Sequence, residues 1–228
     1  MGRSATGEPR ALAMFPLQTV LFPHGELPLH VFEPRYRTLM EDCLAGEREF
    51  GVVLIAQGSD VGGGDRRFAV GTQAHIAAAS RFADGRWALV VEGRQRIAMA
   101  RWLEDAPYPR AEVTDLPDEE GAPEADLLAR AATAVRRVRT LLSELGRPAP
   151  VLPEPLEGPD DVARLWRLCA VAPLTAFDRQ RLLEASGPAT RVTRLIELAE
   201  ARAEDLAALL GASGGAGPPD RGRRTDGD

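Results

Sequence analysis

Residues 15–36 read FPLQTVLFPHGELPLHVFEPRY, and the end of this stretch predicts the start of a helix. Pro34 suits the first turn of a helix, where its missing N–H has no intrahelical partner to lose. Four residues then recur on one helical face before Gly46: Tyr36, Leu39, Met40 and Cys43. The sequence therefore predicts one helix over about 34–46.

The rest of residues 12–122 has the texture of strands joined by turns. Short apolar stretches over 50–56, 74–79, 86–91 and 97–102 are separated by Gly, Pro and Asp. Asp84-Gly85 and Glu92-Gly93 are typical of turns, and each is expected to join two successive antiparallel strands. The segment 58–67, GSDVGGGDRR, is too polar and glycine-rich to pack, so it is expected to be a loop. Its three glycines suggest an anion cradle, but no helix follows to complete such a site, and the loop is favoured.

After about residue 123 the apolar period becomes helical. Six apolar residues recur at intervals of three or four: Leu128, Ala131, Val135, Val138, Leu142 and Leu145. They predict a long helix that buries one stripe and ends near Gly146. The proline-rich segment 147–159 is expected to be an extended loop. Further helices are expected over about 160–171, 176–185 and 189–210.

This division predicts an α+β protein in two units. A strand-built unit over 12–122, with the one helix inserted, precedes a helical bundle over 123–210. Residues 1–11 and 211–228 are mostly small or polar, so both termini are expected to be disordered.

Lysine is absent, since all 28 basic residues are arginine. A phosphate-binding loop of the GxxxxGK[ST] type requires a lysine, and a Ser–Lys dyad requires one that can lose its proton, which arginine does not do. Composition therefore excludes both activities. Ser59 has glycine on one side only, so it does not form the G-x-S-x-G turn of many hydrolases.

The net charge is −6, and residues 11–123 carry 17 acidic residues against 11 arginines. An acidic strand-built unit is a poor partner for a phosphate backbone, so no nucleic acid is expected to bind. Arg136, Arg137 and Arg139 suggest an RNA contact, but their acidic neighbours favour a solvated helix face.

Cysteines, histidines and apolar runs place further bounds on function. Cys43 and Cys169 lie in apolar segments, which indicates buried thiols in a reducing compartment. His24, His30 and His75 lack a recognised ligand spacing, so no metal or other cofactor is expected. The apolar runs are too short to span a bilayer, and the N-terminus lacks the apolar core of a secretory signal. We therefore expect a cytoplasmic protein without membrane contact.

The stretch 15–36 resembles the opening of the Lon protease N-terminal domain family, in which an FPL strand precedes an LFP…LPLhiFEpRY run and a helix. Four later motifs resemble that family in the same order: VGTQAHI at 70–76, DGR at 84–86, EGRQRI at 92–97 and YPRAEV at 108–113. The third departs from the family pattern, with Ile97 where phenylalanine is usual. A looser similarity continues through 173–174 and 178–184.

The resemblance implies a PUA-like pseudo-β-barrel followed by a helical bundle. It also implies a non-catalytic protein that binds unfolded or apolar polypeptide segments, as an adaptor for a separate ATP-dependent protease, with homo-oligomer formation left open. In full-length Lon an ATPase and a peptidase follow this module. The 228 residues stop before either, so we expect the stand-alone bacterial form. An RNA-binding PUA-like protein and a hydrolase with an unrecognised site are the alternatives.

Glu33, Arg35 and Tyr36 form the most distinctive polar cluster. One interpretation is structural: Glu33 pairs with an arginine to fix the strand-to-helix corner, and Tyr36 packs beneath it. The other is that this corner lines a polypeptide groove, with Glu33, Arg35 and Tyr36 as peptide-binding residues. The first interpretation is favoured. A free edge strand and an apolar groove between barrel and bundle are the surfaces expected to accept an extended chain.

Overall fold

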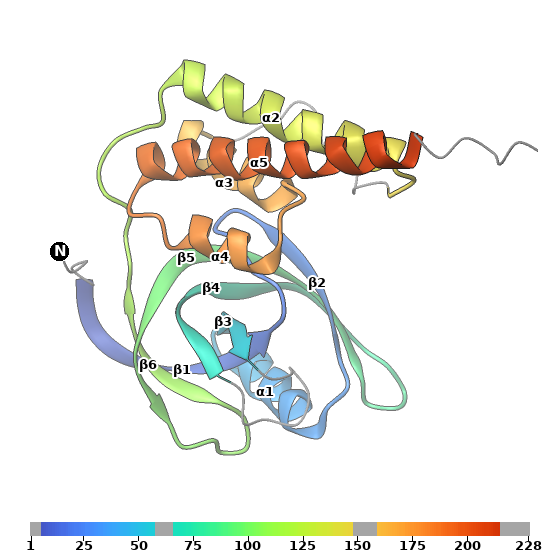
Figure 1. Ribbon diagram of the computed structural model, residues 1–228. Coiled ribbons are helices and arrows are strands. Elements are labelled where there is room, and N and C mark those ends of the chain that lie inside the picture. Colours follow the sequence, from blue (N-terminus) through green and yellow to red (C-terminus); the bar gives the residue numbers. More distant parts are fainter. Residues whose placement is uncertain (1–5, 58–65, 148–158, 215–228) are drawn as a thin grey trace, which may run out of the picture.

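The structure, a computed structural model, describes residues 6–57, 66–147 and 159–214. A strand-built unit holds one helix, and four helices cover one end of it, with α4 nearest the strands (Figure 1). The elements follow in the order β1 (Thr6–Leu17), β2 (Glu26–Val31), α1 (Pro34–Ala45), β3 (Glu49–Gln57), β4 (Arg66–Arg81), β5 (Trp87–Leu103), β6 (Arg110–Asp115), α2 (Ala125–Glu144), α3 (Asp161–Val171), α4 (Ala176–Leu183) and α5 (Pro188–Gly214).

Five of the six strands close into a barrel. The sheet order is β2-β5-β4-β3-β1-β6, and an additional pairing of β5 with β6 completes the ring. β5 changes partner along its length, because residues 87–92 pair with β2 and residues 97–103 pair with β6. Among the described strands, β2 therefore lies outside the closed ring, with β5 as its only neighbour.

Three apolar clusters stabilise the fold by burying side chains away from water. A small cluster around Met14 and Ile97 fills the barrel. A second lies between the barrel wall and α1, and includes Met40. The third is the bundle core, which extends to Val20 and Phe22 in the β1–β2 connection.

A buried ionic network joins the barrel to the bundle. Asp118, in the β6–α2 connection, accepts from Arg96 of β5 at 2.6 Å and from both terminal nitrogens of Arg191 of α5 at 2.7 Å. Arg96 also donates to the carbonyls of Leu183 and Ala185, at 2.9 and 2.7 Å, where α4 ends. These contacts connect three segments that are far apart in the sequence.

The predicted helices agree with the structure to within a few residues. The apolar stripe predicted for the long helix lies on α2, where it is buried from Leu128 to Leu142. α5 continues beyond residue 210, so the expectation of disorder is wrong for 211–214; its last turns are rich in Ala and Leu, which favour helix. Residues 215–228, and most of the predicted loops 58–67 and 147–159, lie outside the described residues. The predicted boundary at 122/123 falls in the β6–α2 connection.

The expectation of a disordered N-terminus is wrong for residues 6–11. β1 begins at Thr6 and pairs antiparallel with β6. Arg10 also donates to Asp115 on β6 at 2.6 Å. Backbone pairing thus orders a segment that has little apolar surface of its own.

The predicted turn at Glu92-Gly93 is also wrong, because β5 runs through it without a break. Gly93 instead permits the close approach of the β1–β2 connection. Its N–H donates to the Gly25 carbonyl at 2.8 Å, and its carbonyl accepts from the N–H of His24 at 2.9 Å. A Cβ at this position would lie 2.0 Å from the carbonyl oxygen of Phe22.

The turn predicted at Asp84-Gly85 is confirmed. It joins β4 to β5, and Gly85 has a φ of +82°, in the left-handed region that favours glycine. Asp84 accepts from the backbone N–H of Arg86, which lowers the pKa of its carboxyl group below the ordinary value.

Candidate functional site

The corner between β2 and α1 is fixed by backbone and side-chain contacts together. Glu33 is the N-cap of α1, in an extended conformation, and its carbonyl accepts from the N–H groups of Tyr36 and Arg37 at 3.1 and 2.9 Å. Its carboxylate accepts instead from Nε of Arg35 at 3.1 Å. The guanidinium of Arg35 in turn lies 4.5 Å from the centroid of the Tyr36 ring, within cation–π range.

Tyr36 packs beneath this ion pair. It is 2% exposed, and its ring centroid lies 4.3 Å from that of Phe15. The structural interpretation of the cluster is therefore confirmed: Glu33 and Arg35 pair above a buried aromatic ring. That these residues also bind peptide stays a prediction.

An apolar hollow of about 70 Å³ opens beside the corner, and we call it the corner hollow. β1 and β2 form its walls, together with the start of α1. Its lining residues are Phe15, Leu17, Leu29, His30, Val31, Phe32, Glu33 and Tyr36. Phe32 is 56% exposed, although it adjoins buried residues on both strands. A large exposed ring beside an apolar hollow is a surface feature typical of recognition sites.

A second, shallower depression of about 360 Å³ lies over β2, β5 and β4, and we call it the outer patch. It is lined by Pro28, Leu29, His30, Ala78, Ala79, Ser80, Ala88, Leu89 and Val90. The strand register explains its character, because Pro28, Val90 and Ala78 are paired across the three strands. Small and apolar side chains on neighbouring strands leave a shallow surface that is mostly carbon.

β2 is the element common to both surfaces, since Leu29 and His30 line the corner hollow and the outer patch alike. As an edge strand, β2 has one side free of strand pairing among the described residues. Pro28 fits this position, because a proline cannot donate to a ladder and is confined to edges within sheets. The result is an unpaired strand edge with apolar surface beside it.

The sequence prediction found part of this site. Glu33 and Tyr36 line the corner hollow, while Arg35 holds Glu33 in place from outside it. The prediction missed Phe32 and Leu29. The alternation along β2 was an available signal. Leu29 and Val31 are buried, so the next residue, Phe32, is expected on the opposite, exposed face.

A depression lies at the junction of barrel and bundle, where an apolar groove was expected. Its lining is mixed, because Pro23, Leu116, Pro117 and Trp166 lie beside Arg94, Arg96 and Asp118. Whether this depression accepts a polypeptide stays a prediction. The edge of β2 differs from it in offering an unpaired strand for main-chain hydrogen bonds.

Reactive groups are sparse in the described part of the chain. Within residues 6–57, 66–147 and 159–214, no three His, Cys, Asp or Glu side chains gather as metal ligands would. Cys43 and Cys169 are free, and burial raises the pKa of each thiol to about 12. Over the same residues, no helix combines the length and apolar character needed to cross a bilayer.

A closed barrel with an edge strand outside its ring, joined to a helical bundle, defines an α+β protein of the PUA-like kind. The family model of the ATP-dependent protease La (LON) substrate-binding domain matches residues 11–201. The chain belongs to this family.

Similar proteins agree with this assignment. A Lon protease of Anaeromyxobacter dehalogenans is 28% identical over 204 residues, 87% of this chain and 24% of that protein. Lon protease 2 of Herpetosiphon aurantiacus is 30% identical over 190 residues, 81% of this chain and 23% of that protein. The chain thus spans about a quarter of the length of these curated relatives.

Two solved structures share the fold. A Lon N-terminal domain protein from Xanthomonas campestris is 28% identical, with a TM-score of 0.61, and the match covers 82% of this chain and 98% of that one. The N-terminal domain of a Mycobacterium avium complex Lon protease is 19% identical, with a TM-score of 0.54, covering 86% and 99%. At that identity the second match supports the fold alone.

Proposed function

We propose that this protein binds unfolded or apolar polypeptide segments along the edge of β2, and that it performs no chemistry on them. Membership of a substrate-binding family supports the general role. The observation that carries the location is the unpaired edge of β2, with the corner hollow and the outer patch beside it.

The geometry suits an extended chain. A strand added to β2 would exchange main-chain hydrogen bonds with it, and successive side chains would point to opposite faces. One set would meet the outer patch, on the face of β2 that carries Pro28 and its partner Val90. The other set would lie on the face that carries Leu29 and Val31, toward the corner hollow. Main-chain pairing is independent of sequence, which suits recognition of many unfolded segments.

We also propose that the bound segments are passed to a separate ATP-dependent protease in the cytoplasm. The similar proteins are Lon proteases, of which this chain spans about a quarter. RNA is the weaker candidate ligand, because residues 11–123 carry 17 acidic residues against 11 arginines, and a phosphate backbone requires positive surface.

The test compares two phenylalanines of equal exposure. Phe32 and Phe177 are each 56% exposed, but Phe177 lies on α4, away from β2. We expect a carboxymethylated, permanently unfolded model protein to bind with roughly micromolar affinity, measured by calorimetry. Phe32→Ser should weaken this binding about tenfold, since a buried aromatic contact is worth roughly 1.5 kcal/mol or more.

The control variant Phe177→Ser should bind within about twofold of the wild type. Thermal unfolding of both variants checks that each is folded. Equal losses of affinity in the two variants would show that the peptide does not bind at β2. Absence of binding by the wild type at high micromolar concentration would contradict the proposed function itself.

A further inference from the structure

A groove between α2 and α5 lies outside the proposed peptide site. The two helices run side by side in the outermost layer of the bundle (Figure 1). The groove has a volume of about 370 Å³ and is lined by Ala129, Arg130, Thr133, Ala134, Arg137, Glu200 and Ala203. Small side chains form much of this lining, so another helix could approach closely.

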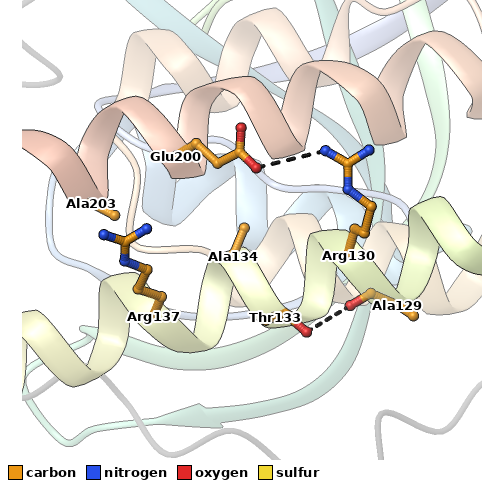
Figure 2. Close-up of a pocket in the computed structure, with 7 residues that line it drawn as sticks. All are labelled: Ala129, Arg130, Thr133, Ala134, Arg137, Glu200 and Ala203. Carbon is orange, nitrogen blue, oxygen red and sulfur yellow. Dashed lines mark hydrogen bonds and ion pairs between the residues drawn. The ribbon is translucent and has the colours of Figure 1, made fainter.

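Of the two arginines that line the groove, one is drawn with an acidic partner and the other without (Figure 2). Arg130 on α2 extends toward Glu200 on α5, at 3.8 Å, and both are exposed. Arg137 lies about two helical turns further along α2, beside Ala203. Among the described residues, no carboxylate lies within 4 Å of Arg137. The groove thus presents an arginine whose charge is available to a partner.

The two helices carry opposite charge. α2 has four arginines and two acidic residues. α5, apart from the buried Arg191, has two arginines and four acidic residues. A uniformly acidic partner would meet Glu200, and a uniformly basic partner would meet Arg130 and Arg137. The surface therefore complements a partner that carries both signs in the same arrangement.

We propose that this groove is the contact surface of a homodimer, with a second copy of the chain seated groove to groove. A two-fold axis parallel to the helices places α2 of each copy opposite α5 of the other, so positive meets negative twice. Such an arrangement is self-complementary and forms a four-helix contact.

Arg137 has a specific partner in this dimer. Within one copy, Ala203 lies beside Arg137 (Figure 2). The next residue, Glu204, is exposed, and because it follows Glu200 by four residues, both lie on the same side of α5. The two-fold axis brings Glu204 of the other copy opposite Arg137. This pair is the contact that variants can address.

The experiment measures molar mass by analytical ultracentrifugation, with the full chain at about 2–200 µM. The wild type should form a dimer with a dissociation constant of roughly 10 µM, which rises with added salt because the contact is ionic. Arg137→Glu and Glu204→Arg should each raise this constant at least about tenfold. The double variant Arg137→Glu/Glu204→Arg should restore it to within about threefold.

The control is Arg86→Glu, which makes the same change of charge on the exposed β4–β5 turn and should leave the dimer unchanged. A wild type that stays monomeric at 200 µM overturns the proposal, as does a dimer that tolerates both single variants or is not restored by the double variant. Phe32→Ser should dimerise normally, so failure of the peptide site and failure of the dimer are separate outcomes.

Discussion

Arg191 is a fully buried arginine, and its charge is compensated within the protein. Both terminal nitrogens donate to Asp118 at 2.7 Å, and Nε donates to the Leu182 carbonyl at 3.2 Å. The guanidinium carbon lies 3.5 Å from the centroid of the Trp166 ring. Removing one partner from such a group leaves the other charge poorly solvated, which costs more than the loss of an exposed ion pair.

Arg191→Met should therefore lower the free energy of unfolding by about 3 kcal/mol, since it leaves Asp118 with Arg96 alone. Arg194→Met is the matched control on the same helix, because Arg194 donates to the Arg181 carbonyl at 3.0 Å in an exposed contact. It should cost less than about 1 kcal/mol. Urea titration of both variants measures the difference. Equal losses in the free energy of unfolding would show that the buried network stabilises the protein no more than an exposed contact does.

The thiol of Cys169 makes the stability of the protein depend on pH in the alkaline range. Burial raises its pKa to about 12 in the folded protein, against an ordinary value of 9.0. Between these values the unfolded thiol ionises and the folded thiol does not, so stability is retained below pH 9 and lost as the pH rises toward 12.

At pH 10 this thiol should remove roughly 1 kcal/mol of stability relative to pH 7. Cys169→Ala should reduce the loss between the two pH values by that amount, whatever its own cost at neutral pH. Urea unfolding of both proteins at pH 7 and pH 10 measures the difference, and an identical pH dependence would contradict the cause assigned here.

At the scale of elements, periodicity predicted what local residues determine. α1 begins at Pro34, as predicted, and the stripe through Leu128 and Val135 faces the bundle core. The errors came from contacts with distant segments. Glu92-Gly93 has the composition of a turn, but Gly93 is held by Phe22, His24 and Gly25, and a local pattern carries no information about that approach.

Gly93→Ala tests the role of this glycine within β5. The added Cβ would lie 2.0 Å from the Phe22 carbonyl oxygen, so the strand or the connection must move. We expect a loss of roughly 2 kcal/mol or more in the free energy of unfolding. Gly211→Ala is the opposite case: nothing lies within 4 Å of its Cβ position in α5, and helix propensity predicts a gain of up to about 1 kcal/mol.

Thermal or urea unfolding distinguishes the two glycine variants, because the free energy of unfolding should fall in Gly93→Ala and rise in Gly211→Ala. If Gly93→Ala were as stable as the wild type, the close approach to the β1–β2 connection would not be the reason for glycine at this position.

At the scale of the whole molecule, the sequence predicted two units but not how they are joined. Asp118 lies 73 residues from Arg191, and any of 28 arginines was a candidate partner. The same limit applies to the binding site. Phe15 and Leu17 reach the corner hollow only because β1 lies beside the β2–α1 corner in the closed fold. Pairings of this kind follow from tertiary structure, which local patterns do not specify.

The junction predicts that barrel and bundle unfold together. Besides the Arg96–Asp118–Arg191 network, Gln180 of α4 donates to the Val70 carbonyl at 3.0 Å, and Arg179 donates to the Val20 carbonyl at 3.2 Å. Barrel groups therefore satisfy polar atoms of the bundle, and separating the units would leave buried charges without partners. A single cooperative transition is the expected consequence.

Trp166→Phe makes this measurable, because the remaining tryptophans, Trp87 and Trp102, both lie on β5 in the barrel. Their fluorescence reports the barrel, while circular dichroism at 222 nm reports mainly the helices of the bundle. The two urea midpoints should coincide within about 0.1 M, and adding Arg96→Met should lower both together. If the midpoints separated, or if Arg96→Met shifted only one of them, the barrel and the bundle would be independent folding units, and the buried network would orient them without coupling their stability.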